Sequence, residues 1–125
     1  MNLDVRRGRG LPRSCRLTKD REIREAYAQG RRWVGRTMVL WLRRGEGASL
    51  RLAVVSSKKV GNAVMRNSAR RRLRDVYRIS RHLFSGDVDV VLVARRKINR
   101  TSAEKVREEL VWLAERAGLV KQETE

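Results

Sequence analysis

The chain has 125 residues, enough for one domain with a modest hydrophobic core. It carries 31 Lys and Arg against 14 Asp and Glu residues, a formal net charge of +17 at pH 7. A small protein with this charge repels itself unless it binds a polyanion, so nucleic acid is the favoured partner and an anionic membrane the alternative. One cysteine, Cys15, and one histidine, His82, exclude an internal disulfide and a Cys/His zinc site.

The apolar residues do not support the membrane alternative. No stretch of about 18 apolar residues is present, so no segment is predicted to span a bilayer. The first sixteen residues also lack the apolar core that a signal peptide needs. We therefore expect a cytoplasmic protein that does not bind a membrane.

The chain opens with a basic segment that has no apolar periodicity. Residues 1–16 contain five arginines and one aspartate, and we expect them to form a flexible basic N-terminal arm. A helix is predicted from about 19 to 29, because apolar residues there share one face and Gly30 follows as a helix stop. The folded domain is expected to cover residues 17–118 and to leave a C-terminal tail at 119–125.

Three segments of alternating or continuous apolar residues predict strands. They are residues 37–43, residues 49–55 after a Gly-containing turn, and residues 87–94, which are nearly all Val and Leu. The composition of the third segment predicts a strand that is covered on both faces.

Two further helices complete the expected fold. Residues 62–81 lack Gly and Pro and place apolar residues at helical spacing, so they predict a long helix. A last helix is predicted to begin at a capping pair, Thr101 and Glu104, and to stop at Gly118. The order helix, strand, strand, helix, strand, helix indicates an α+β fold with helices packed on a small sheet.

Positive charge is concentrated on the long helix. Residues 56–81 hold nine Lys and Arg against Asp75 alone, whereas residues 101–125 hold four against six Glu. Five polar residues recur at i, i+3, i+4, i+7 and i+11 and would line one helix face: Asn67, Arg70, Arg71, Arg74 and Arg78. A merely solvated face usually mixes charges of both signs, so this basic stripe favours a polyanion.

The residues before the long helix are also suited to phosphate. Lys58 and Lys59 follow a predicted strand, and Gly61 permits close approach of the backbone to an anion. Asn62 opens the helix, whose first N–H groups attract anions. The spacing of a P-loop is absent, so nucleotide hydrolysis has no support.

Residues 57–75 resemble the signature of the bacterial ribonuclease P protein family, which reads approximately S-K-K-x-G-N-A-V-x-R-N-R-x-K-R-x-x-R-E. Residues 87–95 are similar to the D-x-V-x-x-A-R strand of that family, and the similarity extends over about residues 16–117. Two positions depart from the pattern. Ser68 replaces an expected base, for which Arg72 is a candidate substitute, and Ile23 replaces an aromatic residue of the first helix.

The resemblance implies a more specific fold than periodicity does. Family members have an αβββαβα order, a mixed sheet and a left-handed crossover through the basic helix, similar to the second domain of ribosomal protein S5. Periodicity alone gives three strands and assumes the common right-handed crossover. The four-stranded sheet and the handedness are therefore expectations from resemblance only.

The resemblance also implies a division of labour with an RNA subunit. In the family, that RNA holds the catalytic centre and its Mg²⁺, while the protein binds the RNA and the 5′ leader of precursor tRNA. This chain likewise shows no catalytic residue and no metal-binding motif, because its acids form no paired-carboxylate motif in a basic context and it lacks a histidine pair.

Site residues can be assigned from the matching positions. The RNA-binding set is Lys58, Lys59, Asn62, Arg66, Asn67, Arg70, Arg71, Arg74 and Arg78. The leader is expected in a cleft between the first helix and the sheet, against Ile23, Tyr27 and Trp41, where aromatic rings can stack on unpaired bases. Trp33 and Trp112 are expected to be packing residues. A structural RNA-binding protein, such as a ribosomal protein, and a self-sufficient metal-dependent nuclease are the alternatives.

Overall fold

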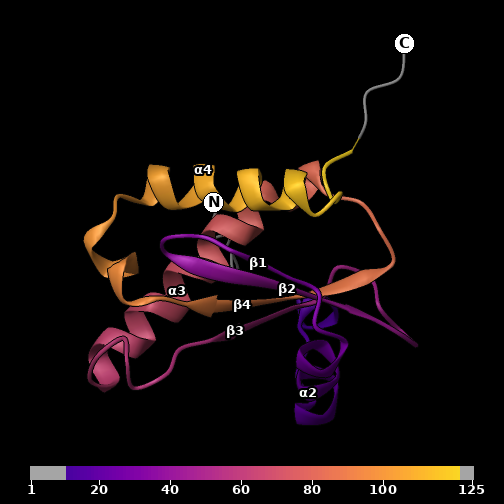
Figure 1. The fold of residues 1–125 in the computed structure, drawn as a ribbon, viewed down its shortest axis with the longest axis horizontal. Helices are drawn as coiled ribbons and strands as arrows, with labels where there is room; N and C mark the ends of the chain where they lie inside the picture. The colour runs from indigo at the N-terminus through magenta and orange to yellow at the C-terminus, as the bar shows by residue number, and fades with distance from the viewer. Residues whose placement is uncertain (1–10, 122–125) are drawn as a thin grey trace.

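The computed structural model describes residues 11–121, which form three α-helices and one four-stranded sheet (Figure 1). The helices are α2 (Asp20–Gln29), α3 (Ala63–Ser80) and α4 (Ala103–Arg116). The strands are β1 (Arg32–Val34), β2 (Met38–Arg44), β3 (Leu52–Val55) and β4 (Val88–Ala94). Short 3₁₀ turns lie at η1 (Arg13–Cys15), η2 (Arg81–Leu83) and η3 (Arg96–Arg100). The predicted α+β class is confirmed.

The sheet is mixed, with strand order β1-β2-β4-β3. β3 pairs with β4 in parallel, and the other two pairings are antiparallel. Periodicity missed β1, because a strand of three residues is too short for alternation to be visible, whereas the resemblance predicted the four strands correctly. α3 connects the parallel strands β3 and β4, and the resemblance predicts that this crossover is left-handed.

The two faces of the sheet are covered unequally. On the first face, residues such as Leu40, Val90 and Leu92 are fully buried beneath α3 and α4. On the second face, Val91 and Ala53 pack with α2, the only α-helix of residues 11–121 on that side. In Figure 1, α4 lies on one side of the sheet and α2 projects from the other, near one end of the strands. The rest of the second face is therefore left more open.

A network of buried ion pairs fixes α2 to the sheet. Asp89 on β4 is fully buried and accepts hydrogen bonds at 2.8 Å from both Arg43 on β2 and Arg51. Arg43 also bonds Glu25 of α2 at 2.8 Å, and Arg51 lies 3.4 Å from Glu22 of the same helix. Burial alone would raise the pKa of Asp89, but the hydrogen bonds from Arg51, a backbone N–H and Arg43 hold it below its ordinary value.

The helix ends lie where the sequence predicts them, with one correction. Gly30 and Gly118 end their helices with φ of +70° and +79°, as their positions predict. The capping pair predicted at Thr101 is wrong by one residue. Ser102 is the N-cap of α4, and its hydroxyl accepts a hydrogen bond from the Lys105 backbone at 3.2 Å. The Thr101 hydroxyl instead donates to the carbonyl of Lys97.

Both ends of the described chain pack on the domain. Leu11 is 4% exposed, and Arg16 forms a β-bridge with Leu52, so residues 11–16 do not form a free arm. At the other end Leu119 is buried and Val120 bridges Phe84, which extends the domain past residue 118. The remainder of the predicted arm, residues 1–10, and of the predicted tail, residues 122–125, lies outside the described residues.

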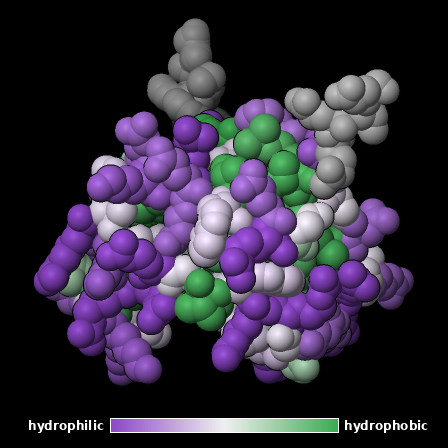
Figure 2. Space-filling view, turned by 45° about the horizontal axis from the view of Figure 1, so that its top comes forward, coloured by the Kyte–Doolittle hydropathy of each residue, from purple (hydrophilic) through white to green (hydrophobic). Residues whose placement is uncertain are grey.

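Hydrophilic side chains dominate the face shown in Figure 2, with smaller hydrophobic patches between them. Within residues 11–121, no helix is long and apolar enough to cross a membrane.

Candidate RNA interface

The basic stripe of α3 is exposed as its spacing predicts. Of its five residues, Arg70 is partly exposed and the other four are exposed, namely Asn67, Arg71, Arg74 and Arg78. The opposite face packs into the core through buried apolar residues of the same helix, among them Leu73 and Val76. Every ion pair in residues 11–121 involves an arginine outside α3. The stripe arginines are therefore not neutralised by a carboxylate within this part of the chain.

The neighbouring polar residues are positioned by hydrogen bonds within the chain. Arg70 donates to the side-chain oxygen of Asn67, which keeps both on the stripe. Arg66 donates to the carbonyl of Gly61 at 2.9 Å. Arg72 donates to the carbonyl of Thr101 at 2.7 Å and is therefore held toward the start of α4. It does not supply the base that Ser68 lacks on the stripe.

The turn before α3 presents two lysines on a fixed backbone. Lys58 and Lys59 are exposed, while Val60 between them and the helix is 7% exposed and anchors the turn to the core. Gly61 has φ of +146°, and the Met65 side chain fills the space that a Cβ would need. The side-chain oxygen of Asn62 accepts a hydrogen bond from the Met65 backbone N–H at 3.0 Å and so caps the helix.

A small cavity adds an arginine to the stripe that sequence reasoning missed. The cavity of about 330 Å³ is lined by Leu11, Arg16, Arg74, Asp75 and Arg78. The Arg16 guanidinium is oriented by a 2.9 Å hydrogen bond to the carbonyl of Leu11. Partial burial lowers the pKa of Arg74, and the nearby positive charges lower it further. Three clustered guanidinium groups with one acid make a favourable environment for a phosphate.

The three residues predicted to contact the leader lie together on the second face. Ile23 and Trp41 are half-buried and pack against the same small cluster beneath α2. Tyr27 is 36% exposed, and its ring centroid lies 4.9 Å from that of Trp41 in an edge-to-face arrangement. Burial raises the pKa of Tyr27 above its ordinary value. Arg32 lies over the Trp41 ring at 5.5 Å, which adds a cation beside the aromatic pair.

The sheet continues this surface beyond α2. Val39, Val55 and Val93 point to the second face and remain only half-buried, because no helix of the described part of the chain covers this end of the strands. The second face therefore presents two aromatic rings, apolar side chains and one nearby arginine to a partner. This combination suits unpaired bases, which stack on aromatic faces while their phosphates approach a cation.

Comparison with known proteins decides the family. The family model described as Ribonuclease P matches residues 11–118, nearly the whole described chain. The chain belongs to the ribonuclease P protein family. It is thus the protein component of a tRNA-processing ribonucleoprotein and has an RNA partner.

Curated relatives support the assignment along almost their full length. The ribonuclease P protein component of Desulforapulum autotrophicum is 34% identical over 100 residues, which cover 80% of this chain and 86% of that protein. The component from Syntrophomonas wolfei is 30% identical over 109 residues, covering 87% and 92%.

Solved structures of the family share the fold. The RNase P protein from Thermotoga maritima matches with a TM-score of 0.71 and 26% identity, covering 81% of this chain and 98% of that one. The protein from Staphylococcus aureus matches with a TM-score of 0.73, covering 86% of this chain and 98% of that one. At 22% identity this match supports the fold alone. The family fold predicted from the motif at 57–75 is therefore confirmed.

Two features of this ribonuclease P protein were not predicted from its sequence. Arg16 faces α3, although it belongs to the segment expected to be an arm. Trp112 is 49% exposed rather than packed, whereas Trp33 is partly buried against the core as expected. Four further basic residues lie between β4 and α4, namely Arg95, Arg96, Lys97 and Arg100, and their clustering in the sequence is the signal that could have indicated a second basic surface.

Proposed function

We propose that this chain binds the catalytic RNA of ribonuclease P through the basic stripe and the 5′ leader of precursor tRNA across the second face of the sheet. In this way it assists the endonucleolytic removal of the leader that produces the mature 5′ end of tRNA. Precursor tRNA is made in the bacterial cytoplasm, so the proposal places the chain there.

The observation that carries the proposal is the unneutralised stripe on α3. Its arginines have no carboxylate partner in residues 11–121, although other arginines of the same chain are fully paired. Arginine binds phosphate through two parallel hydrogen bonds and releases counterions from RNA. Lys58 and Lys59 extend the positive surface to the start of the helix, and Arg16 extends it along the other side.

The leader is assigned to the second face because it is single-stranded. Base-paired RNA presents a wide, shallow groove, whereas unpaired bases can lie flat on Tyr27 and Trp41. The two rings differ in orientation by 71°, so one base would stack on one ring and contact the edge of the other. Such contacts depend little on base identity, as a protein that serves many precursor tRNAs requires.

Catalysis is assigned to the RNA, with the protein contributing charge and position. No group of three His, Cys, Asp or Glu side chains in residues 11–121 could hold a metal ion, so we place Mg²⁺ on the RNA. The protein's arginines would offset repulsion between the phosphates of the RNA subunit and the substrate. The expected consequence is a lower Mg²⁺ requirement for cleavage.

Reconstitution tests the proposal. The full chain is mixed with a bacterial ribonuclease P RNA and precursor tRNA at a Mg²⁺ concentration where the RNA alone cleaves poorly. We expect the chain to increase cleavage at the 5′ end of the mature sequence, and the chain without RNA to cleave nothing. Absence of stimulation would contradict the proposal, and cleavage by the chain alone would assign the chemistry to the protein.

A further inference from the structure

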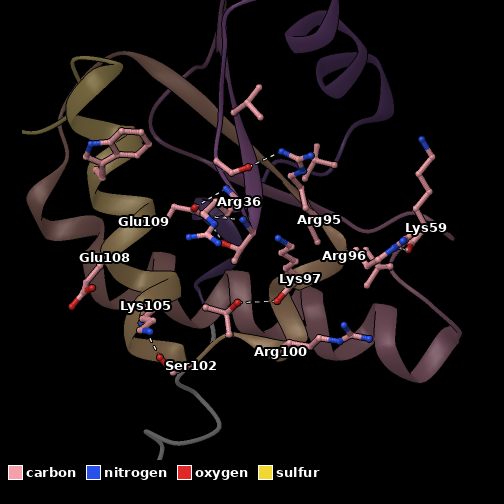
Figure 3. Close-up of a pocket in the computed structure, with 18 of the residues that line it drawn as sticks. Arg36, Lys59, Arg95, Arg96, Lys97, Arg100, Ser102, Lys105, Glu108 and Glu109 are labelled. Atoms are coloured by element: carbon pink, nitrogen blue, oxygen red, sulfur yellow. Dashed lines mark hydrogen bonds between the residues drawn. The ribbon is translucent and has the colours of Figure 1, made fainter.

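A large basic pocket lies at the end of the sheet, away from α2. Its volume is about 1,580 Å³, and it is bounded by the β1–β2 turn, the end of β4, η3 and the first turns of α4. Figure 3 shows the labelled side chains, which come from these segments and, for Lys59, from the turn before α3. Seven basic residues and two acidic ones line it. We call it the strand-end pocket.

The two glutamates that line the strand-end pocket neutralise only part of its positive charge. Glu109 accepts hydrogen bonds from the backbone of Arg36 and of Thr37 at 2.6 and 2.9 Å, and it also bonds the Thr37 hydroxyl. Its approach requires Gly35, because a Cβ there would collide with the carboxylate. Glu109 thus holds the β1–β2 turn, and Glu108 is the remaining acid of the lining.

Two of the basic side chains are held by carbonyl groups, which do not neutralise their charge. Arg95 donates to the carbonyl of Gly35 at 2.8 Å, and Arg96 contacts that of Lys59 at 3.4 Å (Figure 3). Within residues 11–121, none of the seven basic side chains forms an ion pair with a carboxylate, since the ion pairs there involve Arg21, Arg43 and Arg51. Like charges gathered in one concavity favour an anionic ligand.

An exposed aromatic residue accompanies this charge. Trp112 is 49% exposed and Val34 is 52% exposed, and both line the pocket. Arg116 lies over the Trp112 ring at 5.0 Å and steadies its position. An indole beside several unpaired cations is the combination by which proteins bind single-stranded nucleic acid, through stacking and phosphate contacts.

The pocket also adjoins both proposed RNA surfaces. Val93, which points to the second face, and Lys59, from the turn before α3, both belong to its lining. A single-stranded RNA lying along the open part of the second face would therefore reach the pocket at Val93. The volume exceeds the roughly 300–1,000 Å³ of typical small-molecule sites, which favours a polymer.

We propose that the strand-end pocket binds a further single-stranded RNA segment, with a base stacked on Trp112 and phosphates held by Arg36, Arg100 and Lys105. The shared chemistry is an unpaired ribonucleotide run, from either the distal part of the leader or the catalytic RNA. The source of the RNA rests on the proposed function, whereas the binding preference of the pocket does not.

Direct binding is measured first, with the full chain and a labelled single-stranded RNA oligonucleotide. Trp112→Ala is expected to weaken binding about fivefold or more, since stacking is worth about 1–3 kcal/mol per base. Trp112→Phe should retain most of the affinity, and Ile79→Ala, at an exposed apolar residue of α3, should have no effect. Circular dichroism and thermal melting confirm that each variant is folded.

The charge contribution is tested by a matched pair of double variants. Arg100→Ala with Lys105→Ala removes two cations of the pocket, and Arg107→Ala with Lys121→Ala removes two outside it. Only the first pair should weaken oligonucleotide binding strongly. Equal losses from both pairs, or unchanged binding in folded Trp112→Ala, would overturn the proposal. So would tighter Trp112-dependent binding of a polyglutamate peptide, which would indicate an acidic protein partner.

The reconstituted complex then distinguishes the two sources. If the leader fills the pocket, Trp112→Ala should weaken binding of precursors with long leaders and leave those with very short leaders unchanged. If the catalytic RNA fills it, affinity for that RNA should fall whatever the leader. No effect on either would overturn a role in the complex. Trp112-dependent oligonucleotide binding without any stimulation of cleavage would retain the pocket and reject the proposed function.

Discussion

Two groups of arginines in this molecule differ in whether a carboxylate neutralises them. Arg43 and Arg51 meet Asp89 and two glutamates of α2 at 2.8 to 3.6 Å, and Arg43 is only 3% exposed. The stripe arginines of α3 lie at the surface without a carboxylate partner in residues 11–121. The same side chain therefore has two roles: the paired arginines hold the fold together, and the unpaired ones are available to phosphate.

The largest expected effect comes from removing Asp89, the carboxylate that the paired arginines share. Asp89→Ala leaves Arg43 and Arg51 without their shared buried carboxylate, and we expect a loss of roughly 3–5 kcal/mol in the free energy of unfolding. Urea unfolding followed by circular dichroism measures it. Asp75→Ala, at an exposed acid of α3, is the control and should change stability by less than about 0.5 kcal/mol. Similar losses of stability in both variants would show that the ion pairs of Asp89 do not hold the fold together.

The pKa of Asp89 adds a pH dependence with a defined sign. It is lower in the folded protein than in the unfolded chain, so ionised Asp89 stabilises the fold fully above the unfolded pKa. This contribution is lost as pH falls through the folded pKa. Acid should therefore destabilise the natural chain more than Asp89→Asn, measured as the change in melting temperature between neutral and acidic pH. Parallel pH profiles would contradict the assignment.

The unpaired group is tested through RNA rather than through stability. Arg70→Ala with Arg74→Ala should weaken binding to ribonuclease P RNA by about 3 kcal/mol, at about 1.5 kcal/mol for each charge-assisted contact. The slope of log affinity against log salt should become shallower by roughly one to two units. Arg107→Ala with Lys121→Ala is the control. If the control pair has the same effect, the charge acts globally and the stripe is not the binding surface.

The aromatic pair on the second face should produce a smaller and more selective effect. Tyr27→Ala and Trp41→Ala are each expected to weaken binding of precursor tRNA by about 1–3 kcal/mol while mature tRNA, which has no leader, binds as before. Trp41 also packs in the small cluster beneath α2 and contacts Tyr27 of that helix, so circular dichroism must first show that the variants are folded. A folded variant that loses both ligands equally would count against leader binding.

The smallest expected effect is stabilisation of the free protein by an anion. Neighbouring like charges on α3 destabilise the helix, and sulfate bound between Arg16, Arg74 and Arg78 would offset this. At about ten times its Kd, sulfate should add roughly 1.4 kcal/mol of stability. The melting temperature should rise more in dilute sodium sulfate than in sodium chloride of equal ionic strength, and Arg16→Ala should abolish the difference. Equal melting temperatures in the two salts for the natural chain would remove the specific site.

The sequence predicted the parts of the molecule that depend on local pattern. The stripe follows from helical spacing, and the family from an ungapped motif at 57–75. Strand β1 was missed by periodicity because its three residues are held by pairing with β2, which no local pattern records. The burial of Leu11, the position of Arg16 and the exposure of Trp112 depend on contacts between segments far apart in the chain. The ion-pair network could not be predicted for the same reason, since Glu22, Arg43 and Asp89 meet only after folding.

Arginine-selective chemical modification tests the central claim most directly. The chain is treated with phenylglyoxal alone and in an active complex with ribonuclease P RNA, and the modified arginines are identified by mass spectrometry. In the free chain, Arg71, Arg74 and Arg78 should react readily while buried Arg43 does not. In the complex, the stripe should become protected while Arg21 on α2 remains reactive. A stripe that stays fully reactive in an active complex would contradict the account.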